Sequence, residues 1–296
     1  LAAAIEEKKI TPETVFTVPY ALKRSVKTFH DHEPHANQRL TASGILALSS
    51  NTGSIQIGEM LSNDTLHNYL SKFGIGEKTG SGLPGESRGI LPKVADWSGT
   101  TAPTVAFGQG YSLTAMQATS VFATIANDGV RVSPTVIAGT SDASGNYTPS
   151  ATRESIRVLS SDTAQKMRIM MESVVSANGT APTAAIAGYR VAGKTGTAQR
   201  IDDTCGCYRG YTASFIGFAP ADKPAYVISV TIQDPKGLHW GGALGGPVFK
   251  KVMSFVLQSK GIAPTGTKVD PVALTEKQLL AERKLAEQKA ARVKTN

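Results

Sequence analysis

The segment Ala225–Gln233 alternates apolar and polar residues from Ile228 to its end. Its apolar residues would share one face of a strand: Tyr226, Ile228, Val230 and Ile232. This pattern is typical of a strand with one buried face in an antiparallel sheet. Two strand-like segments precede it, Gly188–Gln199 and Tyr211–Ala219, and the connections between the three suit hairpins. We therefore expect three consecutive antiparallel strands in this part of the chain.

Helical periodicity dominates the residues before these strands and returns after them. We expect helices at Leu40–Leu48, Ile55–Leu61, Thr65–Phe73, 114–127, 161–175 and Pro247–Lys260. The expected N-cap residues are Thr41 for the first, Asn63 or Asp64 for the third, and Ser161 or Asp162 for the fifth. The glycine-rich stretch Gly74–Gly89 and the polar stretch Gly139–Ala151 are expected to be loops. Helices followed by strands and a closing helix indicate an α+β fold.

The composition is that of a globular chain. It has 296 residues, of which 41% are hydrophobic and 18% charged, enough to bury a packed core. Its net charge is +8, but the basic residues are not interleaved with aromatic ones, so we expect no nucleic-acid binding. No run of 18 apolar residues is present that could span a membrane. The chain begins at Leu1, in what reads as the middle of a helix, and we expect the natural N-terminus to lie upstream.

The composition changes near the C-terminus. Residues 271–296 are rich in Ala, Glu, Lys, Leu, Gln and Arg, contain no aromatic residue and have only a thin apolar stripe. Thr275 and Gln278 have the spacing of a capping box, so a helix is expected there, although it would be marginal alone. We therefore divide the chain into one domain over residues 1–268 and a charged tail, helical or disordered, over residues 269–296.

The two cysteines, Cys205 and Cys207, are separated by one glycine. A single close pair is neither a disulfide framework nor a zinc site. A disulfide between them would close a small, strained ring. The sequence leaves a disulfide and two free thiols equally open.

Three histidines, His30, His32 and His35, lie close together with Asp31 and Glu33 among them. These residue types raise the question of a metal site. However, a proline interrupts the segment, and the H-x-H-x-x-H spacing matches no common zinc motif. We interpret the segment as a polar loop and expect neither a metal nor a cofactor.

The first strand-like segment carries the run Gly193-Lys194-Thr195-Gly196-Thr197. Its glycines leave the backbone bare beside a cation and a hydroxyl, as happens where a ligand or another backbone comes close. Together these groups could receive a carboxylate and a developing oxyanion. Taken alone, the run is equally compatible with an edge strand that carries a solvated lysine.

A second short motif, Ser49-Ser50-Asn51, lies at the end of the first expected helix. S-x-N alone is common by chance, but S-x-N followed by K-T-G is a motif pair of penicillin-binding proteins and class A β-lactamases. Further segments extend the likeness: Phe73–Gly76, Thr79–Glu86, Ala106–Thr114, Ala126–Gly129, Ala213–Pro220 and Gly246–Lys250. Over about residues 1–266 the chain resembles the class B penicillin-binding proteins of the division type, which are monofunctional peptidoglycan transpeptidases.

The resemblance implies the penicillin-binding, serine-transpeptidase fold, with an antiparallel sheet flanked by helices and an all-helical subdomain. It implies catalytic roles for Ser49, Asn51, Lys194 and Thr197, and substrate binding by Thr195 and Gly196. Ser49 would relay a proton toward the leaving amine, Asn51 would hydrogen-bond the acyl donor, and Lys194 would supply positive charge. Thr195 would bind the terminal carboxylate, and the Thr197 N–H would form half of the oxyanion hole. In a regular strand Lys194 and Thr195 point to opposite faces, so the pattern alone does not explain how both reach one site.

One motif of the family is absent. S-x-x-K carries the acylated serine and its lysine base in the family, and no serine of this chain has a lysine three positions later. We expect this nucleophile, and the first two strands of the family's five-stranded sheet, to lie before Leu1. Without them the chain would take no penicillin label, and Ala225–Gln233 would become an exposed sheet edge.

The resemblance implies an enzyme that cross-links stem peptides ending in D-Ala-D-Ala through a serine acyl-enzyme, and that β-lactams acylate. It implies septal wall synthesis on the extracytoplasmic face of the cell membrane, with division-complex membrane proteins that include a glycosyltransferase. A β-lactamase, a D,D-carboxypeptidase and a non-catalytic β-lactam sensor share the motifs. A β-lactamase would also have to activate water, for which Glu86 is a candidate by residue type only.

Overall fold

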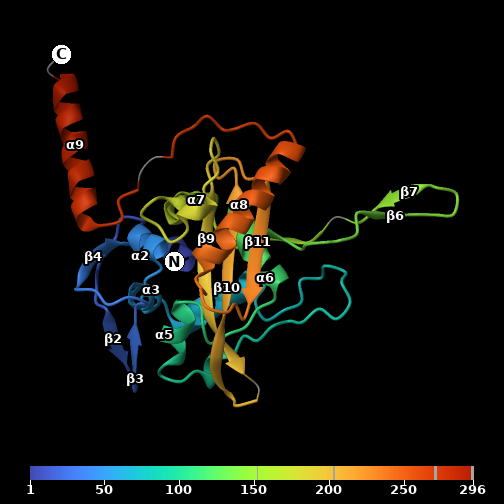
Figure 1. Ribbon diagram of the computed structural model, residues 1–296, viewed down its shortest axis with the longest axis horizontal. Coiled ribbons are helices and arrows are strands. Elements are labelled where there is room, and N and C mark those ends of the chain that lie inside the picture. The colour runs from blue at the N-terminus through green and yellow to red at the C-terminus, as the bar shows by residue number, and fades with distance from the viewer. Residues whose placement is uncertain (152, 203, 270–271, 295–296) are drawn as a thin grey trace.

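The computed structural model describes residues 1–151, 153–202, 204–269 and 272–294 of the chain. It combines helices and sheets, as Figure 1 shows, and confirms the expected α+β class. All strand pairs within these ranges are antiparallel.

The central sheet has three strands in the order β11-β10-β9. They are β9 (Ala192–Asp202), β10 (Cys207–Ala219) and β11 (Tyr226–Gln233), which confirms the three successive strands expected from the sequence. β9 and β10 run further toward their hairpin than predicted, because pairing resumes beyond a register shift between Tyr208 and Tyr211. In the described ranges no other strand pairs with β11, so one side of it is a sheet edge.

The hairpin between β9 and β10 carries the two cysteines. Cys205 and Cys207 form a disulfide, and both residues are exposed. The choice that the sequence left open is therefore decided in favour of the disulfide.

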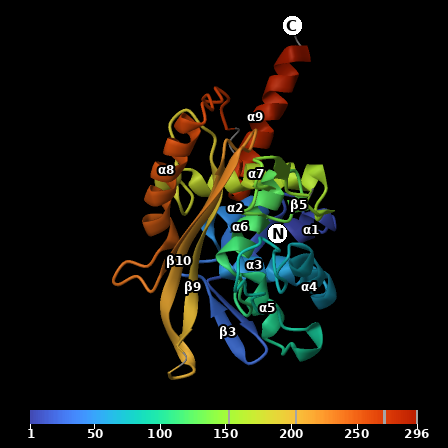
Figure 2. The same ribbon diagram turned by 90° about the vertical axis from the view of Figure 1, so that its right-hand side faces the viewer.

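Helices cover both faces of the sheet. Figure 2 shows α8 (Gly241–Ser259) on one side, and α6 (Ala115–Ala126) and α7 (Ser161–Val175) on the other. The fully buried rings of Phe215 on β10 and Phe249 on α8 meet edge to face, with 4.9 Å between their centroids. Burying one such side chain stabilises the fold by about 1.5–3 kcal/mol.

The helical side of the molecule consists of shorter helices. They are α1 (Ala2–Glu6), α2 (Ala42–Leu48), α3 (Asn51–Gly58), α4 (Asn63–Lys72) and α5 (Thr101–Ala106), with single 3₁₀ turns at Val94–Asp96 and Pro182–Ala184. The predicted cap Thr41 is confirmed, since its hydroxyl accepts the Gly44 N–H. α3 begins four residues before the predicted Ile55 because Ser50 caps it.

Two other cap predictions were wrong by one or two residues. α4 is capped by Ser62 instead of Asn63 or Asp64, and α7 by Ser160 instead of Ser161 or Asp162. In each case the serine backbone is extended and its hydroxyl accepts the N–H three residues later, which the residues after it cannot do from inside the helix.

Short two-stranded ribbons complete the fold. β1 (Val15–Val18) pairs with β4 (Gln38–Thr41), β2 (Ala21–Arg24) with β3 (Lys27–His30), and β5 (Val130–Val132) with β8 (Ser155–Arg157). The stretch predicted as a polar loop at Gly139–Ala151 is instead a hairpin of β6 (Gly139–Ser141) and β7 (Tyr147–Pro149). The Asp142 carboxylate closes its turn by accepting the N–H groups of Ser144 and Asn146.

The tail contains the expected helix, α9 (Glu276–Lys294), which projects from the body in Figure 1. The residues just before it pack against the domain. Ala273 and Leu274 are buried, and the Leu274 carbonyl accepts the Thr41 N–H at the start of α2. The tail is thus held at its base and is not a free appendage.

The close packing of α2 on α3 gives the first prediction. A Cβ at Gly53 would lie 2.7 Å from Cγ1 of Ile45. We expect Gly53→Ala to lower the free energy of unfolding by about 1–3 kcal/mol through overpacking. Urea unfolding of Gly53→Ala, Ile45→Ala and the double variant measures it. Since Ile45→Ala removes the clash, the double variant should lose less than the two single losses added together, and strict additivity would refute the packing argument.

Candidate active site

The S-x-N motif forms the junction between α2 and α3. Ser49 ends α2 in the left-handed conformation, with φ of 57°, and Ser50 caps α3 by accepting the Gly53 N–H at 2.9 Å. A left-handed conformation costs a residue other than glycine about 1–2 kcal/mol. Such a conformation persists only where the surroundings fix it, and it occurs often at functional sites.

Lys194, on β9, reaches this junction from the sheet. Its Nζ donates to the Ser49 Oγ at 2.7 Å, across 145 positions of sequence. The two residues to which the resemblance gives catalytic roles are therefore in direct contact. The K-T-G strand and the S-x-N turn belong to one site.

Thr195 joins the same site although it is next to Lys194 in the strand. The Lys194 side chain folds back, so that Nζ lies 3.2 Å from the Thr195 carbonyl oxygen and 3.4 Å from its Oγ1. Thr195 Oγ1 also lies 3.0 Å from Oγ1 of Thr180, in the turn after α7. Lys194 and Thr195 leave the strand on opposite faces, but the lysine side chain is long enough to reach back to Thr195. Both residues therefore take part in one site.

Small residues let the start of α8 approach this strand. A Cβ on Gly241 would lie 2.3 Å from the Gly196 carbonyl oxygen, and a Cβ on Gly196 would lie 2.5 Å from the Ser214 Oγ. At this contact the Gly241 N–H donates to the Thr197 Oγ1 at 3.2 Å. Gly196 therefore serves close packing, and the first turn of α8 holds the Thr197 side chain.

Asn51 is the third residue of the S-x-N motif and the first residue of α3. Its side-chain amide donates to the His30 carbonyl at 2.9 Å. Among the described residues no hydrogen bond joins Asn51 to Ser49 or Lys194. The structure therefore brings Ser49, Lys194 and Thr195 into direct contact and places Asn51 beside them with a different partner.

The three clustered histidines point to separate neighbours. The His35 ring contacts Asp31 at 3.0 Å, the His32 ring lies 5.7 Å from Trp240, and the His30 ring lies 5.1 Å from Tyr20. Among the described residues no group of three or more His, Cys, Asp or Glu side chains is placed to hold a metal ion.

The electrostatics of the site centre on Lys194. Burial lowers the pKa of its ammonium group from 10.5 to about 8. Within the described part of the chain no carboxylate forms an ion pair with it. A partly buried amine close to its titration point, bonded to one hydroxyl and close to another, can pass a proton or hold an anion.

The sequence did not indicate two of these contacts. Thr180 was not singled out as a site residue, and Asp31 was expected only to be part of a polar loop. Thr180 meets Thr195 because β9 passes the turn after α7, and no local pattern reports such packing.

The chain is similar to known proteins along most of its length. Residues 1–254 match the penicillin-binding protein transpeptidase domain family. The penicillin-binding protein PbpB of Mycolicibacterium smegmatis is 39% identical over 271 residues, which are 88% of this chain and 42% of the relative. The peptidoglycan D,D-transpeptidase FtsI of Buchnera aphidicola is 34% identical over 263 residues, 88% of this chain and 44% of the relative.

Solved structures show the same likeness. Penicillin binding protein 3 from Mycobacterium tuberculosis, in complex with ampicillin, superposes with a TM-score of 0.88 at 37% identity. The match covers 93% of this chain and 63% of that one. The chain spans less than half the length of the two relatives above.

The depressed pKa of Lys194 gives the second prediction. Burial disfavours the ammonium form, so the folded chain should release this proton near pH 8, before the unfolded chain does near 10.5. Stability relative to Lys194→Met should therefore rise as pH increases through that window. Lysine-labelled NMR, with Lys194→Met to assign the signal, measures the midpoint. A midpoint near 10.5 would contradict the burial of the amine.

Proposed function

The chain belongs to the penicillin-binding protein transpeptidase family, and we propose that it is the larger part of the catalytic domain of a peptidoglycan D,D-transpeptidase. The observation that carries this proposal is the 2.7 Å contact between Lys194 Nζ and Ser49 Oγ. It unites the S-x-N and K-T-G motifs of the family beside Thr195. We propose that residues 1–268 belong to this domain and that residues 269–296 are an additional segment.

The proposed reaction begins with a serine hydroxyl that attacks the carbonyl carbon between the two D-Ala residues of a stem peptide. The C–N bond breaks, the hydroxyl proton passes to the leaving amine of D-Ala, and an ester-linked acyl-enzyme remains. The amine of a second stem peptide then attacks the ester carbonyl, a new C–N bond forms as the C–O bond to the serine breaks, and the proton lost by the amine passes to the serine oxygen. No S-x-x-K stands in this chain, so we propose that the nucleophile and its lysine base belong to a part of the protein outside it.

The residues of the site have distinct proposed tasks. Ser49, bonded to Lys194, relays the proton toward the leaving amine, and the Lys194 charge favours anionic groups nearby. The Thr195 hydroxyl binds the terminal carboxylate of the donor peptide, and the Thr197 N–H is half of the oxyanion hole. Asn51 hydrogen-bonds the donor peptide once it is released from the His30 carbonyl.

Gly196 contributes through its lack of a side chain. A Cβ there would lie 2.5 Å from the Ser214 Oγ, so the bare position lets the strand pack on Ser214 and leaves the backbone beside Thr195 open to a peptide. We propose that donor peptide and β-lactam both occupy this stretch of β9.

A β-lactamase would need a base that activates water for deacylation of the acyl-enzyme. Glu86 was the candidate base of a β-lactamase, but its carboxylate accepts the N–H groups of Thr79 and Gly80 at 2.8 and 3.2 Å. These bonds, together with one from the Thr79 hydroxyl, hold the glycine-rich loop and depress the pKa of Glu86. A carboxylate engaged in this way is a weak base, which favours transpeptidation over a β-lactamase reaction.

The relatives also suggest where the protein acts. We propose that it works in septal wall synthesis on the extracytoplasmic face of the cell membrane, with division-complex membrane proteins that include a glycosyltransferase. The support is the likeness to a named peptidoglycan D,D-transpeptidase and to β-lactam complexes of the family. In the ranges that the structure describes, no helix is long and apolar enough to cross a membrane.

The missing nucleophile gives the third prediction. The 296-residue chain alone should form no covalent adduct with a fluorescent penicillin, whereas the full-length protein should be labelled stoichiometrically. In the full-length protein Ser49→Ala should slow labelling about 10²–10⁴-fold, because the proton relay is lost. Ser254→Ala on α8 is the control and should label normally. An adduct that maps to Ser49 or Ser50 in the chain alone would refute the mechanism.

The disulfide gives the fourth prediction. It lies at the exposed hairpin tip and contacts none of the site residues named above. Changing Cys205 and Cys207 to serine in the full-length protein should leave the rate of penicillin acylation within about threefold, because the two sulfurs are bonded to each other and neither is a thiol that could act as a nucleophile. Gel-based labelling measures this rate. Complete loss of labelling would show that the hairpin tip supports the site.

A further inference from the structure

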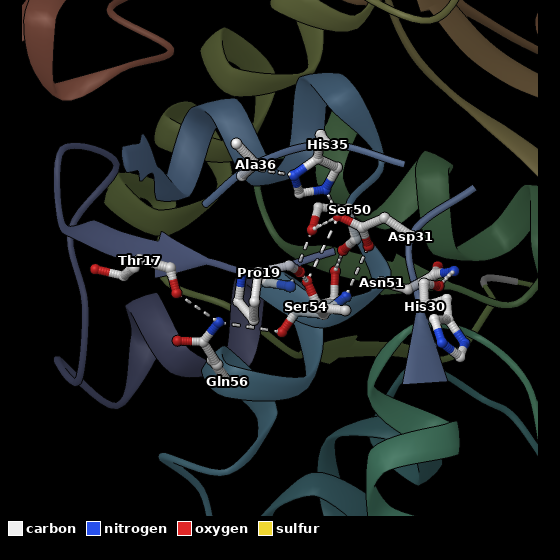
Figure 3. A network of polar contacts seen from close by, with 12 residues as sticks. Thr17, Pro19, His30, Asp31, His35, Ala36, Ser50, Asn51, Ser54 and Gln56 are labelled. Carbon is white, nitrogen blue, oxygen red and sulfur yellow. Dashed lines mark hydrogen bonds and ion pairs between the residues drawn. The ribbon is translucent and has the colours of Figure 1, made fainter. Parts of the chain in front are cut away.

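The turn that carries Ser49 rests on a buried carboxylate. Asp31, directly after β3, is only 8% exposed. Its Oδ2 accepts the Ser50 hydroxyl at 2.7 Å, and its Oδ1 accepts the Thr52 N–H in the first turn of α3 at 2.9 Å. Figure 3 shows the side chains of Asp31, Ser50 and His35 converging on one point. Buried carboxylates are stable only when they are hydrogen-bonded in this way.

Ser50 is held from two directions at once. Its Oγ accepts the Gly53 N–H, so its single hydroxyl proton is free to be donated, and Asp31 receives it. The two bonds fix the rotamer of Ser50 and the backbone on both sides of it. One of those sides is Ser49, whose left-handed conformation directs its hydroxyl to Lys194.

His35 closes the other side of the carboxylate. Its Nδ1 lies 2.7 Å from the Ala36 carbonyl oxygen and its Nε2 lies 3.0 Å from Oδ2 of Asp31. Burial disfavours a charged ring, but the bonds to the Ala36 carbonyl and to Asp31 outweigh it and raise the pKa of His35 above its ordinary value, which favours the doubly protonated ring. Tyr20, whose ring meets His35 edge to face at 6.0 Å, covers it on the side of the β1–β2 turn. The Asp31 carboxylate is thus in hydrogen-bond contact both with the turn and with His35.

The histidine segment, residues 30–35, also contacts the opposite side of the site. His32, one residue after Asp31, packs its ring against Trp240, the residue that precedes α8. The next residue, Gly241, donates its N–H to Thr197. The histidine segment therefore touches both the S-x-N turn and the helix that holds the K-T-G strand.

From these contacts we propose that Asp31, supported by His35, is a positioning residue that holds the Ser49-Ser50-Asn51 turn in its reactive geometry. The inference rests on the proposed function, because an effect on the acylation rate presupposes that the protein is acylated. A positioning role also accounts for the histidine segment, which neither metal binding nor the motif pair explains. Asp31 touches no reacting atom in this account and acts through Ser50.

Asp31→Asn is the sharpest variant. The amide oxygen can still accept the Thr52 N–H, but an amide nitrogen in the place of Oδ2 can accept neither the Ser50 proton nor the His35 N–H, so these two links break. In the full-length protein we expect the rate constant for acylation by a fluorescent penicillin to fall about 10–100-fold, since small displacements of a reactive group are costly. The affinity of the non-covalent complex should change less than about threefold. His35→Gln can still donate to Asp31 and should stay within about threefold of the wild type.

Glu6→Gln is the matched control. The Glu6 carboxylate accepts the hydroxyl and the N–H of Ser160, the serine that caps α7, so the same chemical change is made at another capped helix. Both variants should lower the melting temperature, but only Asp31→Asn should slow acylation. Equal slowing by the two, or normal acylation in Asp31→Asn, would overturn the proposal.

A crystal structure of Asp31→Asn decides the matter independently of activity. We expect Ser49 Oγ to leave hydrogen-bond distance of Lys194 Nζ; an unchanged 2.7 Å contact would overturn the inference. If the wild-type full-length protein takes no penicillin label, the proposed function fails. The positioning role of Asp31 then stands or falls on this crystal structure.

Discussion

The hydrogen bond from Lys194 to Ser49 is the contact on which the site depends. It is formed only if the sheet and the helical side of the molecule meet at a fixed distance, because the two residues are 145 positions apart. The sheet side is fixed by α8, whose first turn comes close to β9 where Gly196 and Gly241 have no side chains. The helical side is fixed by the direct junction of α2 and α3, where Gly53 packs on Ile45.

These constraints explain why a strained turn and a buried amine occur together. The left-handed conformation of Ser49 and the burial of Lys194 are each unfavourable alone. Their hydrogen bond, and the bonds that Asp31 makes to the next turn, offset part of that cost and select one geometry. The lowered pKa of Lys194 is the electrostatic result of the same burial.

Features that depend on local patterns were predictable from the sequence. The alternation in β11, the Thr41 cap and the motif pair each follow from short-range periodicity or spacing. Caps were misplaced where residues of the cap-forming types adjoin, as at Ser160 and Ser161, because only backbone geometry distinguishes them. The hairpin at residues 139–149 was missed because its strands are short and polar, without the alternation that marks a buried face.

Contacts that arise only from tertiary packing could not be read from the sequence. The bond between Thr195 and Thr180, and the docking of Leu274 against Thr41, join segments that no periodicity relates. The reach of Lys194 to Thr195 depends on a side-chain conformation that strand alternation does not describe. The histidine segment was expected to be a polar loop; its Asp31 is buried because a serine, a helix N-terminus and a histidine all donate to it.

The central claim is that the S-x-N turn and the K-T-G strand form one substrate site. A crystal structure of the full-length protein acylated by benzylpenicillin tests it most directly. We expect the carboxylate of the bound drug to lie within hydrogen-bond distance of the Thr195 hydroxyl, with Ser49 and Lys194 still in contact beside it. A drug bound with its carboxylate away from β9, or a site in which Ser49 and Lys194 have separated, would contradict it.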